Sequence, residues 1–341
     1  MQIGNGNFAF GADITGLQTF LPFAIMSSWG WKNDSFPAGR TLDDILSYKG
    51  VSLDNHGRNV TYMYGGVSDI QQWLISNPNR VNLGRIGLLF SDTSGNVLNI
   101  AETDLINKSQ TLDLWTGRIS SSFLLHGISV NVTTICAQDS DTIGIEIYSP
   151  LVSQNGLGLF LDFPWADGSS KFSAPFVGVF NMTSNHTTSL LHGSSLSHDA
   201  QAMINHTMVN NSFLTTIGGS EFDISRDSPT SHRYSIHPKV NQSYFAVSVS
   251  FSLSPPESLP TYSDVEASSE ILQKFWSNGG FVDVYTGSTD SRANELQRRI
   301  ILSQYLLRAN EAGDYPPQEV VLIILFISIC TDSTVSVRPR K

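Results

Sequence analysis

Two acidic residues near the middle of the chain have the types and spacing that sugar chemistry requires. Asp162 and Asp167 lie in the sequence L-D-F-P-W-A-D-G, with Trp165 between them. Cleavage of a glycosidic bond uses two carboxyl groups, one as an acid and one as a base or nucleophile. Aspartates after a buried strand also favour turns, which is the commoner use of such residues. Both interpretations stay open at this point.

Other side chains could border a sugar site. Trp29 and Trp31, in S-S-W-G-W-K-N-D-S, could stack on a sugar ring, although packing in the core or between domains is the commoner fate of tryptophan. Gln318 and Glu319 follow a Pro-Pro pair and could also line such a site, but Glu319 has no nearby partner carboxylate.

The glycines at Gly4, Gly6 and Gly11 raise the question of a phosphate-binding loop. Such a loop needs a strand before it and a helix N-terminus after it. Only three residues precede Gly4, and no Lys-Ser/Thr pair follows Gly11 closely. We therefore interpret these glycines as serving a tight turn or a close crossing of two backbones.

The composition narrows the class of protein. Of the 341 residues 40% are apolar and only 15% are charged, against about 25% in ordinary soluble domains. Serine (47) and threonine (23) supply the polar surface instead. A net charge of −10 argues against a nucleic-acid partner, since phosphate contacts need clustered lysine and arginine.

Cysteines and histidines give no sign of a disulfide framework, a metal or another cofactor. Cys136 and Cys330 are the two cysteines, and no C-x-x-C or H-E-x-x-H spacing occurs. His186 and His206 fall inside N-x-T sequences, where we expect loop residues.

The asparagines point to glycosylation. Given 22 asparagines and 70 serines and threonines in 341 residues, chance alone gives about four or five N-x-S/T sequons. The chain has nine, all before residue 242: Asn33, Asn59, Asn107, Asn131, Asn181, Asn185, Asn205, Asn210 and Asn241. This excess predicts a secreted, extracellular glycoprotein, unless asparagine and serine merely share the same turns.

The first residues contain no signal peptide, because they lack both a basic segment and an apolar one. The chain is therefore either cytosolic or lacks its true start. We expect a missing start, since the sequence begins inside what resembles a first strand.

A period of two dominates residues 80 to 254. Ile143, Ile145 and Ile147 alternate with smaller or polar residues, and so do Phe245 to Leu253, which predicts strands with one buried and one wet face. Clusters of turn residues separate the runs. Many short strands over some 250 residues predict a large antiparallel β-sandwich over residues 1–254.

The period becomes helical after Pro255, Pro256 and Pro260. Ser263 to Glu266 has the form of a capping box, and we expect a linker with a helix over residues 255–287, broken at Gly279-Gly280. Residues 291–312 form a further expected helix with an apolar stripe and Gly313 as its stop. Two helices cannot make a domain alone.

Residues 320–341 do not continue any pattern. The apolar run V-V-L-I-I-L-F-I-S-I-C has 11 residues, far short of the roughly 20 that a transmembrane helix needs. Because every valine codon begins with GT, we expect an aberrant tail translated from an unspliced intron or after a frameshift.

Two of these stretches carry a family resemblance. Residues Ser288 to Glu319 (S-T-D-S-R-A-N-E-L-Q-R-R-I-I-L-S-Q-Y-L-L-R-A-N-E-A-G-D-Y-P-P-Q-E) resemble the opening of the (α/α)6 barrel of six-hairpin glycosidases. Within that class, this stretch resembles proteins related to glycoside hydrolase family 65, the maltose phosphorylase and acid trehalase group. Ile3-Gly-Asn-Gly6 resembles the start of the N-terminal sandwich of those enzymes.

The resemblance covers residues 1–319 and implies a galactose-mutarotase-like β-supersandwich, a helical linker and then a truncated catalytic barrel at 288–319. It implies a carbohydrate substrate, cleaved with inversion by hydrolysis or phosphorolysis. The family's acid lies deeper in the barrel, so no catalytic residue is expected here and this chain is expected to be inactive. The alternatives are a non-catalytic secreted sandwich that binds glycans or a partner, and a damaged product that never folds stably.

Overall fold

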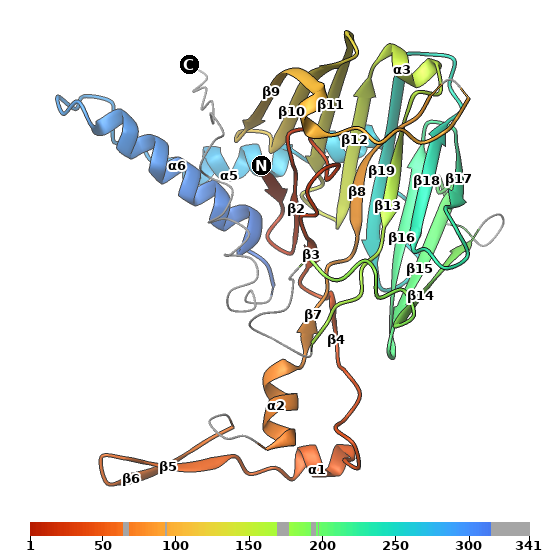
Figure 1. The fold of residues 1–341 in the computed structure, drawn as a ribbon. Coiled ribbons are helices and arrows are strands. Elements are labelled where there is room, and N and C mark those ends of the chain that lie inside the picture. The colour runs from red at the N-terminus through yellow and green to blue at the C-terminus, as the bar shows by residue number, and fades with distance from the viewer. Residues whose placement is uncertain (64–67, 93, 169–176, 192–195, 197, 315–341) are drawn as a thin grey trace.

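The structure is a computed structural model that describes residues 1–63, 68–92, 94–168, 177–191, 196 and 198–314. Its largest element is an antiparallel sheet in the order β14-β15-β16-β19-β12-β11-β10-β9. A smaller sheet in the order β17-β18-β13-β8 packs against it (Figure 1). This mainly β architecture confirms the antiparallel sandwich that the two-residue period predicts.

The strands of the large sheet are β9 (Leu105–Asp113), β10 (Arg118–Leu125), β11 (Ile128–Cys136), β12 (Thr142–Tyr148), β14 (His186–Leu191), β15 (Ala202–Met208), β16 (Asn211–Gly219) and β19 (Tyr244–Ser252). Those of the small sheet are β8 (Arg85–Phe90), β13 (Leu157–Asp162), β17 (Phe222–Arg226) and β18 (Arg233–Pro238). A third sheet holds β1 (Gln2–Gly4), β2 (Phe8–Gly11) and β3 (Ile25–Ser27), and short helical turns lie at α3 (Pro150–Ser153) and Glu102–Asp104.

The core lies between the two main sheets. Ile143, Ile145 and Ile147 on β12 are fully buried, and Val247 and Val249 pair beside them on β19. Each such side chain contributes about 1.5–3 kcal/mol by leaving water. The alternation in the sequence therefore identifies the face of each strand that forms the core.

The opposite face of β19 is not wet, and that prediction is wrong. Ser248 and Ser250 are also buried. The helix α4 (Tyr262–Ala267) packs on β11, β12 and β19, and the Ser248 hydroxyl donates a hydrogen bond to the carbonyl of Pro260. A helix from later in the chain covers a face that the strand sequence alone marks as polar.

The linker helices differ from the prediction in detail. α4 is capped by Thr261, whose side chain accepts from the Asp264 amide, and not by Ser263. The next helix, α5 (Glu270–Phe275), buries Leu272 but leaves Ile271 exposed. The expected break at Gly279-Gly280 is a single wide turn at Trp276–Gly280, in which Gly279 has φ +107°. Trp276 donates from its indole Nε1 to the Leu114 carbonyl at 2.7 Å.

The last described helix, α6 (Ala293–Asn310), has two apolar stripes. Ile301, Tyr305 and Ala309 are buried, and the helix packs on β1 and β2. On another side Leu296 and Leu307 are 52% and 53% exposed. The helix ends at Asn310, so Gly313 is not its stop. No helix in these described ranges is long and apolar enough to cross a membrane.

Residues 33–63 and 68–78 form an arm that projects away from the sandwich (Figure 1). It holds α1 (Leu42–Leu46), the hairpin β5 (Val51–Asn55) and β6 (Arg58–Tyr62), and α2 (Asp69–Ser76). It joins the body through β4 (Trp31–Lys32), which pairs with β7 (Asn79–Arg80). The sequence analysis treats this region as part of the sandwich and does not predict the arm.

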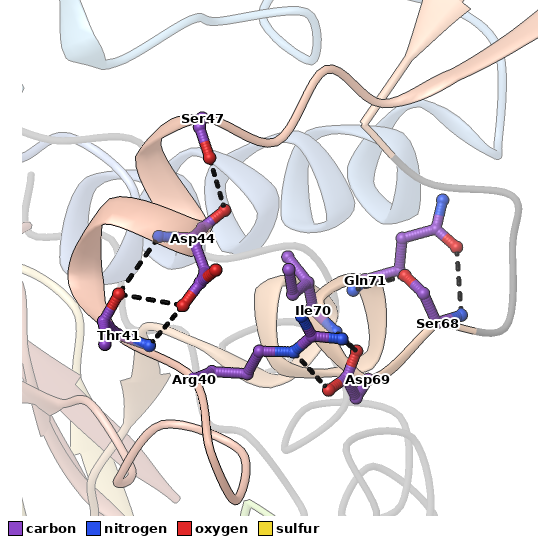
Figure 2. A network of polar contacts seen from close by, with 8 residues as sticks. All are labelled: Arg40, Thr41, Asp44, Ser47, Ser68, Asp69, Ile70 and Gln71. Atoms are coloured by element: carbon purple, nitrogen blue, oxygen red, sulfur yellow. Dashed lines mark hydrogen bonds and ion pairs between the residues drawn. The ribbon is translucent and has the colours of Figure 1, made fainter.

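Local polar contacts hold the two arm helices. Thr41 caps α1 in a capping box with Asp44, and Ser68 caps α2 with Gln71 (Figure 2). Arg40 ties the two helices together by donating two hydrogen bonds to Asp69, at 2.7 and 3.0 Å. Because this ion pair is exposed to solvent, it orients the helices more than it stabilises them.

Candidate functional site

The root of the arm brings some of the predicted residues together. On β4, Trp31 is 41% exposed while Lys32 is fully buried. The Lys32 ammonium forms an ion pair with Asp34 and lies 4.4 Å from the centre of the Trp165 ring. A buried ammonium requires such partners, because its desolvation is otherwise too costly. Lys32 was not predicted as a site residue, since a lysine between a tryptophan and an asparagine gives no signal of burial.

Trp165 links this root to the body of the sandwich. Its backbone exchanges hydrogen bonds with Val179, and its ring lies 6.3 Å from that of His186. Gly168 packs close to the Asp34 carboxylate, which brings the end of the L-D-F-P-W-A-D-G segment to the arm. Trp165 and half-buried Asp167 therefore belong to this junction.

Asp162 has a different environment. It stands opposite Arg85 on β8 and opposite Arg233 on β18, on the face of the small sheet that points away from the core. The guanidinium of Arg233 lies 4.0 Å from the centre of the Phe160 ring. Burial raises the pKa of Asp162 to about 6, although both arginines act to lower it. Asp162 thus lies between two arginines of the small sheet, whereas the printed neighbours of Trp165 are Lys32 and His186.

Trp29 is an internal support. Its indole Nε1 donates to Asp141 at 2.6 Å, and its ring packs 5.9 Å from that of Phe213. The Ser27 hydroxyl donates to the same carboxylate at 2.6 Å. Burial raises the pKa of Asp141, against the effect of these two hydrogen bonds. Of the two tryptophans, Trp31 is the one with a face open to a ligand. Gln318 and Glu319 lie outside the described residues.

The expectation that His186 and His206 are loop residues is wrong. Both are buried in strands, β14 and β15, and His232 beside β18 joins them. The alternation His186, Thr188, Leu190 marks the inward face of β14 and was the signal available in the sequence. Within the parts of the chain that the structure describes, no group of three or more His, Cys, Asp or Glu side chains could hold a metal ion.

The glycines at the start of the chain allow a close approach of two backbones. A Cβ on Gly4 would lie 2.3 Å from the Ala309 carbonyl oxygen, and one on Gly6 would lie 2.5 Å from that of Ala312. Gly313 is equally close to the Gly6 carbonyl oxygen, at 2.4 Å from a built Cβ. The close-crossing interpretation is confirmed for Gly4 and Gly6.

Hydrogen bonds complete this contact, which we call the clasp (residues 2–7 with 305–314). The Gly6 amide donates to the Ala309 carbonyl at 3.0 Å, and Arg308 donates to the Asn5 carbonyl at 2.6 Å. Asn7 and Asp314 exchange two more hydrogen bonds. The two stretches that carry the family resemblance thus bind each other.

Comparison with known proteins agrees in fold. No family model matches the chain, and no curated protein matches it. Among solved structures, a protein from the human microbiome described as a candidate kojibiose phosphorylase matches with a TM-score of 0.51. The match covers 89% of this chain and 39% of that chain at 8% identity. The likeness is one of fold.

A bacterial glucoamylase in complex with acarbose matches less well. Its TM-score is 0.42 at 10% identity, over 67% of this chain and 35% of that chain, which is too low to support an inference. The chain spans about two fifths of the length of the protein described as a candidate kojibiose phosphorylase. These likenesses leave the membership of glycoside hydrolase family 65 unconfirmed.

Most of the sequon asparagines are accessible. Eight of the nine are exposed, and the exception is Asn205 on β15. Asn205 is half-buried, and its Oδ1 has no hydrogen-bond partner within the described part of the chain. Exposure is required for a glycan in the folded protein, so the structure separates Asn205 from the other eight.

Proposed function

We propose that this chain is the N-terminal portion of a carbohydrate-active enzyme of the six-hairpin glycosidase type, in which residues 288–319 begin the catalytic barrel. The sandwich fold and its likeness to a phosphorylase-like protein support the proposal. The observation that carries the proposal is the exposed apolar side of α6. One side of this helix is clasped to the sandwich, while Leu296 and Leu307 on another side stay exposed.

An exposed apolar stripe on a well-anchored helix favours further helices as its cover. In the intact enzyme the next barrel helices would bury Leu296, Ile300 and Leu307. The sandwich would then serve as a rigid base that fixes the direction in which the barrel begins. This role fits the close contact of the backbone at Gly4 and Gly6 with the backbone at the end of α6, where no side chain lies between the two segments.

The proposed reaction is the cleavage of a glycosidic bond with inversion, by water or by phosphate. A carboxylic acid protonates the glycosidic oxygen, and the second reactant attacks from the opposite side of the ring. For an inverting hydrolase the two carboxyl groups stand about 6.5–9.5 Å apart. We assign neither role to Asp162, which lies between Arg85 and Arg233, nor to Asp167, because the resemblance places the acid further along the barrel. The acid would follow residue 319.

The test compares residues 1–341 with a form extended past Glu319 in the reading frame that genomic sequence around the Val320 codon supplies. Both are assayed on glucose disaccharides of each linkage, with and without inorganic phosphate, and the product anomer is recorded. We expect inverting activity in the extended form alone. The double variant Asp162→Asn, Asp167→Asn of that form should keep its activity.

Two outcomes would overturn the proposal. Cleavage by residues 1–341 alone would mean that the acid lies within this chain. Inactivity of both forms would instead favour a non-catalytic secreted sandwich, for which exposed Trp31 offers a stacking face. Binding of the same sugars without turnover, lost in Trp31→Ala, would identify that alternative.

A further inference from the structure

Three histidines, two on the strands β14 and β15 and one directly before β18, meet inside the sandwich at the edge where β14 ends the large sheet. His186 Nδ1 and His206 Nε2 share a hydrogen bond of 2.8 Å, and the rings of His186 and His232 lie 3.9 Å apart. Each histidine is no more than 5% exposed. We call these three residues the histidine cluster.

The hydrogen bonds around His232 define its protonation state. Its Nε2 lies 2.8 Å from the Thr183 carbonyl, which can only accept, so Nε2 carries the proton. Its Nδ1 therefore accepts, from Thr188 at 2.8 Å and from Arg226 at 3.2 Å. A second proton on Nδ1 would end the bond from Arg226, would reverse the bond with Thr188, and would place a positive charge against the guanidinium.

The pair formed by His186 and His206 is neutral for a similar reason. One ring must donate and the other accept in their shared hydrogen bond. Their outer nitrogens, His186 Nε2 and His206 Nδ1, are buried and have no hydrogen-bond partner within the described ranges. An added proton would thus create a buried cation with no group to receive it.

The groups that touch the histidine cluster are positive or neutral, and the carboxylate of Asp34 is paired with Lys32. Arg226 approaches from β17, while Thr188 on β14 and Tyr234 on β18 are linked by a 2.8 Å hydrogen bond. Phe163, which directly follows β13, and Phe213 on β16 pack on His206. From the arm comes Lys32, on the Trp165 ring that neighbours His186, with Asp34 as its ion partner. No carboxylate is among the groups that shift the three histidines.

We propose that the histidine cluster is an acid-sensitive latch, which holds β14 and the root of the arm to the sandwich at neutral pH and releases them in acid. Among the described strands, β14 lies at the edge of the sheet and pairs with β15 alone, so it can detach without opening the centre of the sandwich. The root of the arm is released together with β14, because the Trp165 ring lies between His186 and Lys32.

The direction of the pH effect follows from proton linkage. Burial lowers the pKa of His186 to about 4, and lowers those of His206 and His232 as well. The opened state, whose histidines have a pKa of about 6.5, thus takes up protons before the closed state does. The latch is stable above pH 6.5 and weakens as the pH falls toward 4, by up to about tenfold per pH unit for each histidine.

The experiment measures hydrogen exchange of the whole chain between pH 7 and pH 4, corrected for the intrinsic rate at each pH. Peptides covering residues 183–191 and 226–234 report on the latch, and a peptide covering 142–148 reports on the core. We expect the protection of the first two to fall about a hundredfold or more. The core peptide should stay protected over the same range.

Two variants assign the effect. His206→Gln keeps a neutral hydrogen-bonding side chain and should flatten the pH dependence of the latch peptides. His232→Gln serves the same purpose should the first variant fail to fold. His198→Gln is the matched control, since this side chain is 80% exposed and pairs with Asp199; it should leave the pH profile unchanged.

The proposal is refuted if latch and core peptides lose protection together at every pH. It is also refuted if the histidine variants keep the pH slope of the unsubstituted protein.

Discussion

Asp162 illustrates how a single residue can combine the signs of catalysis with a structural role. Its pKa of about 6 and its place after a strand are typical of an active-site carboxyl group. However, its neighbours are two arginines that come from the adjacent strands in register. A perturbed pKa needs a reacting partner before it indicates chemistry, and the contacts of Asp162 give it none.

We predict that Asp162→Asn changes how stability depends on pH. The carboxyl group has a higher pKa in the folded protein than in the unfolded chain, so its stabilising contribution is present below about pH 4 and is lost as the pH rises through 6. The asparagine variant should therefore gain on the order of 2 kcal/mol relative to the unsubstituted protein between pH 4 and 7. Urea unfolding at each pH measures this.

The matched control is Asp223→Asn. Asp223 lies on β17 in the same sheet, but its carboxylate is 67% exposed and pairs with Lys239. It should not alter the pH profile. Equal profiles for the Asp162 variant and the unsubstituted protein would contradict the assigned environment of Asp162.

Single residues are the scale at which the sequence predicts least. The exposure of eight sequons follows from their polar surroundings, but the burial of Lys32 and of His186 does not. Both are placed by partners more than a hundred residues away in sequence or on another strand, such as Trp165 and His206. A pattern of neighbours along the chain carries no information about such contacts.

At the scale of elements, the strands are predictable because each has one face in the core. The face that α4 covers was predicted as wet, since serine is polar wherever it lies. The cap of α4 was placed two residues too late, because Thr261 and Ser263 can each accept the capping hydrogen bond. The arm was missed because helices of five and eight residues have little periodicity.

The clasp gives a prediction for an element contact. Gly6→Ala should detach the end of α6, because the added Cβ would meet the Ala312 carbonyl at 2.5 Å and backbone cannot move aside cheaply. We expect a loss of roughly 2–4 kcal/mol in unfolding free energy. Amides of residues 301–310 should also lose protection from hydrogen exchange.

Gly39→Ala separates the steric effect from the backbone strain. Both glycines have positive φ, +98° and +76°, but a Cβ on Gly39 would meet no atom within 4 Å. The control should cost about 1 kcal/mol, the price of a left-handed alanine. Equal losses in the two variants would mean that the clasp is not tight.

At the scale of the whole molecule, glycosylation tests the secretion that the sequons predict. With a secretory leader added, we expect glycans on the exposed sequons and none on Asn205 of the folded, secreted protein. Asn205 stands between Ser189 on β14 and Leu214 on β16, and its side-chain Oδ1 is buried, whereas the other eight sequon asparagines are exposed. Site-by-site mass spectrometry after enzymatic deglycosylation measures the occupancy.

Asn131 is the matched comparison, because it also lies within a strand but is exposed. Asn131→Gln should remove the mass of one glycan, and Asn205→Gln should remove none. Full occupancy of Asn205 in monodisperse secreted protein, or vacancy of most exposed sequons, would count against the proposal.

The clasp has a consequence for how the protein is made. Arg308 and Asn5 are 303 residues apart in sequence. At about 5–20 residues per second, the ribosome therefore makes Arg308 roughly 15–60 s after Asn5. During that time Ile3, Phe8 and Phe10, which end up in the core, lack the cover of α6. The strands β1 and β2 are thus synthesised long before α6 and are among the last described elements to be covered.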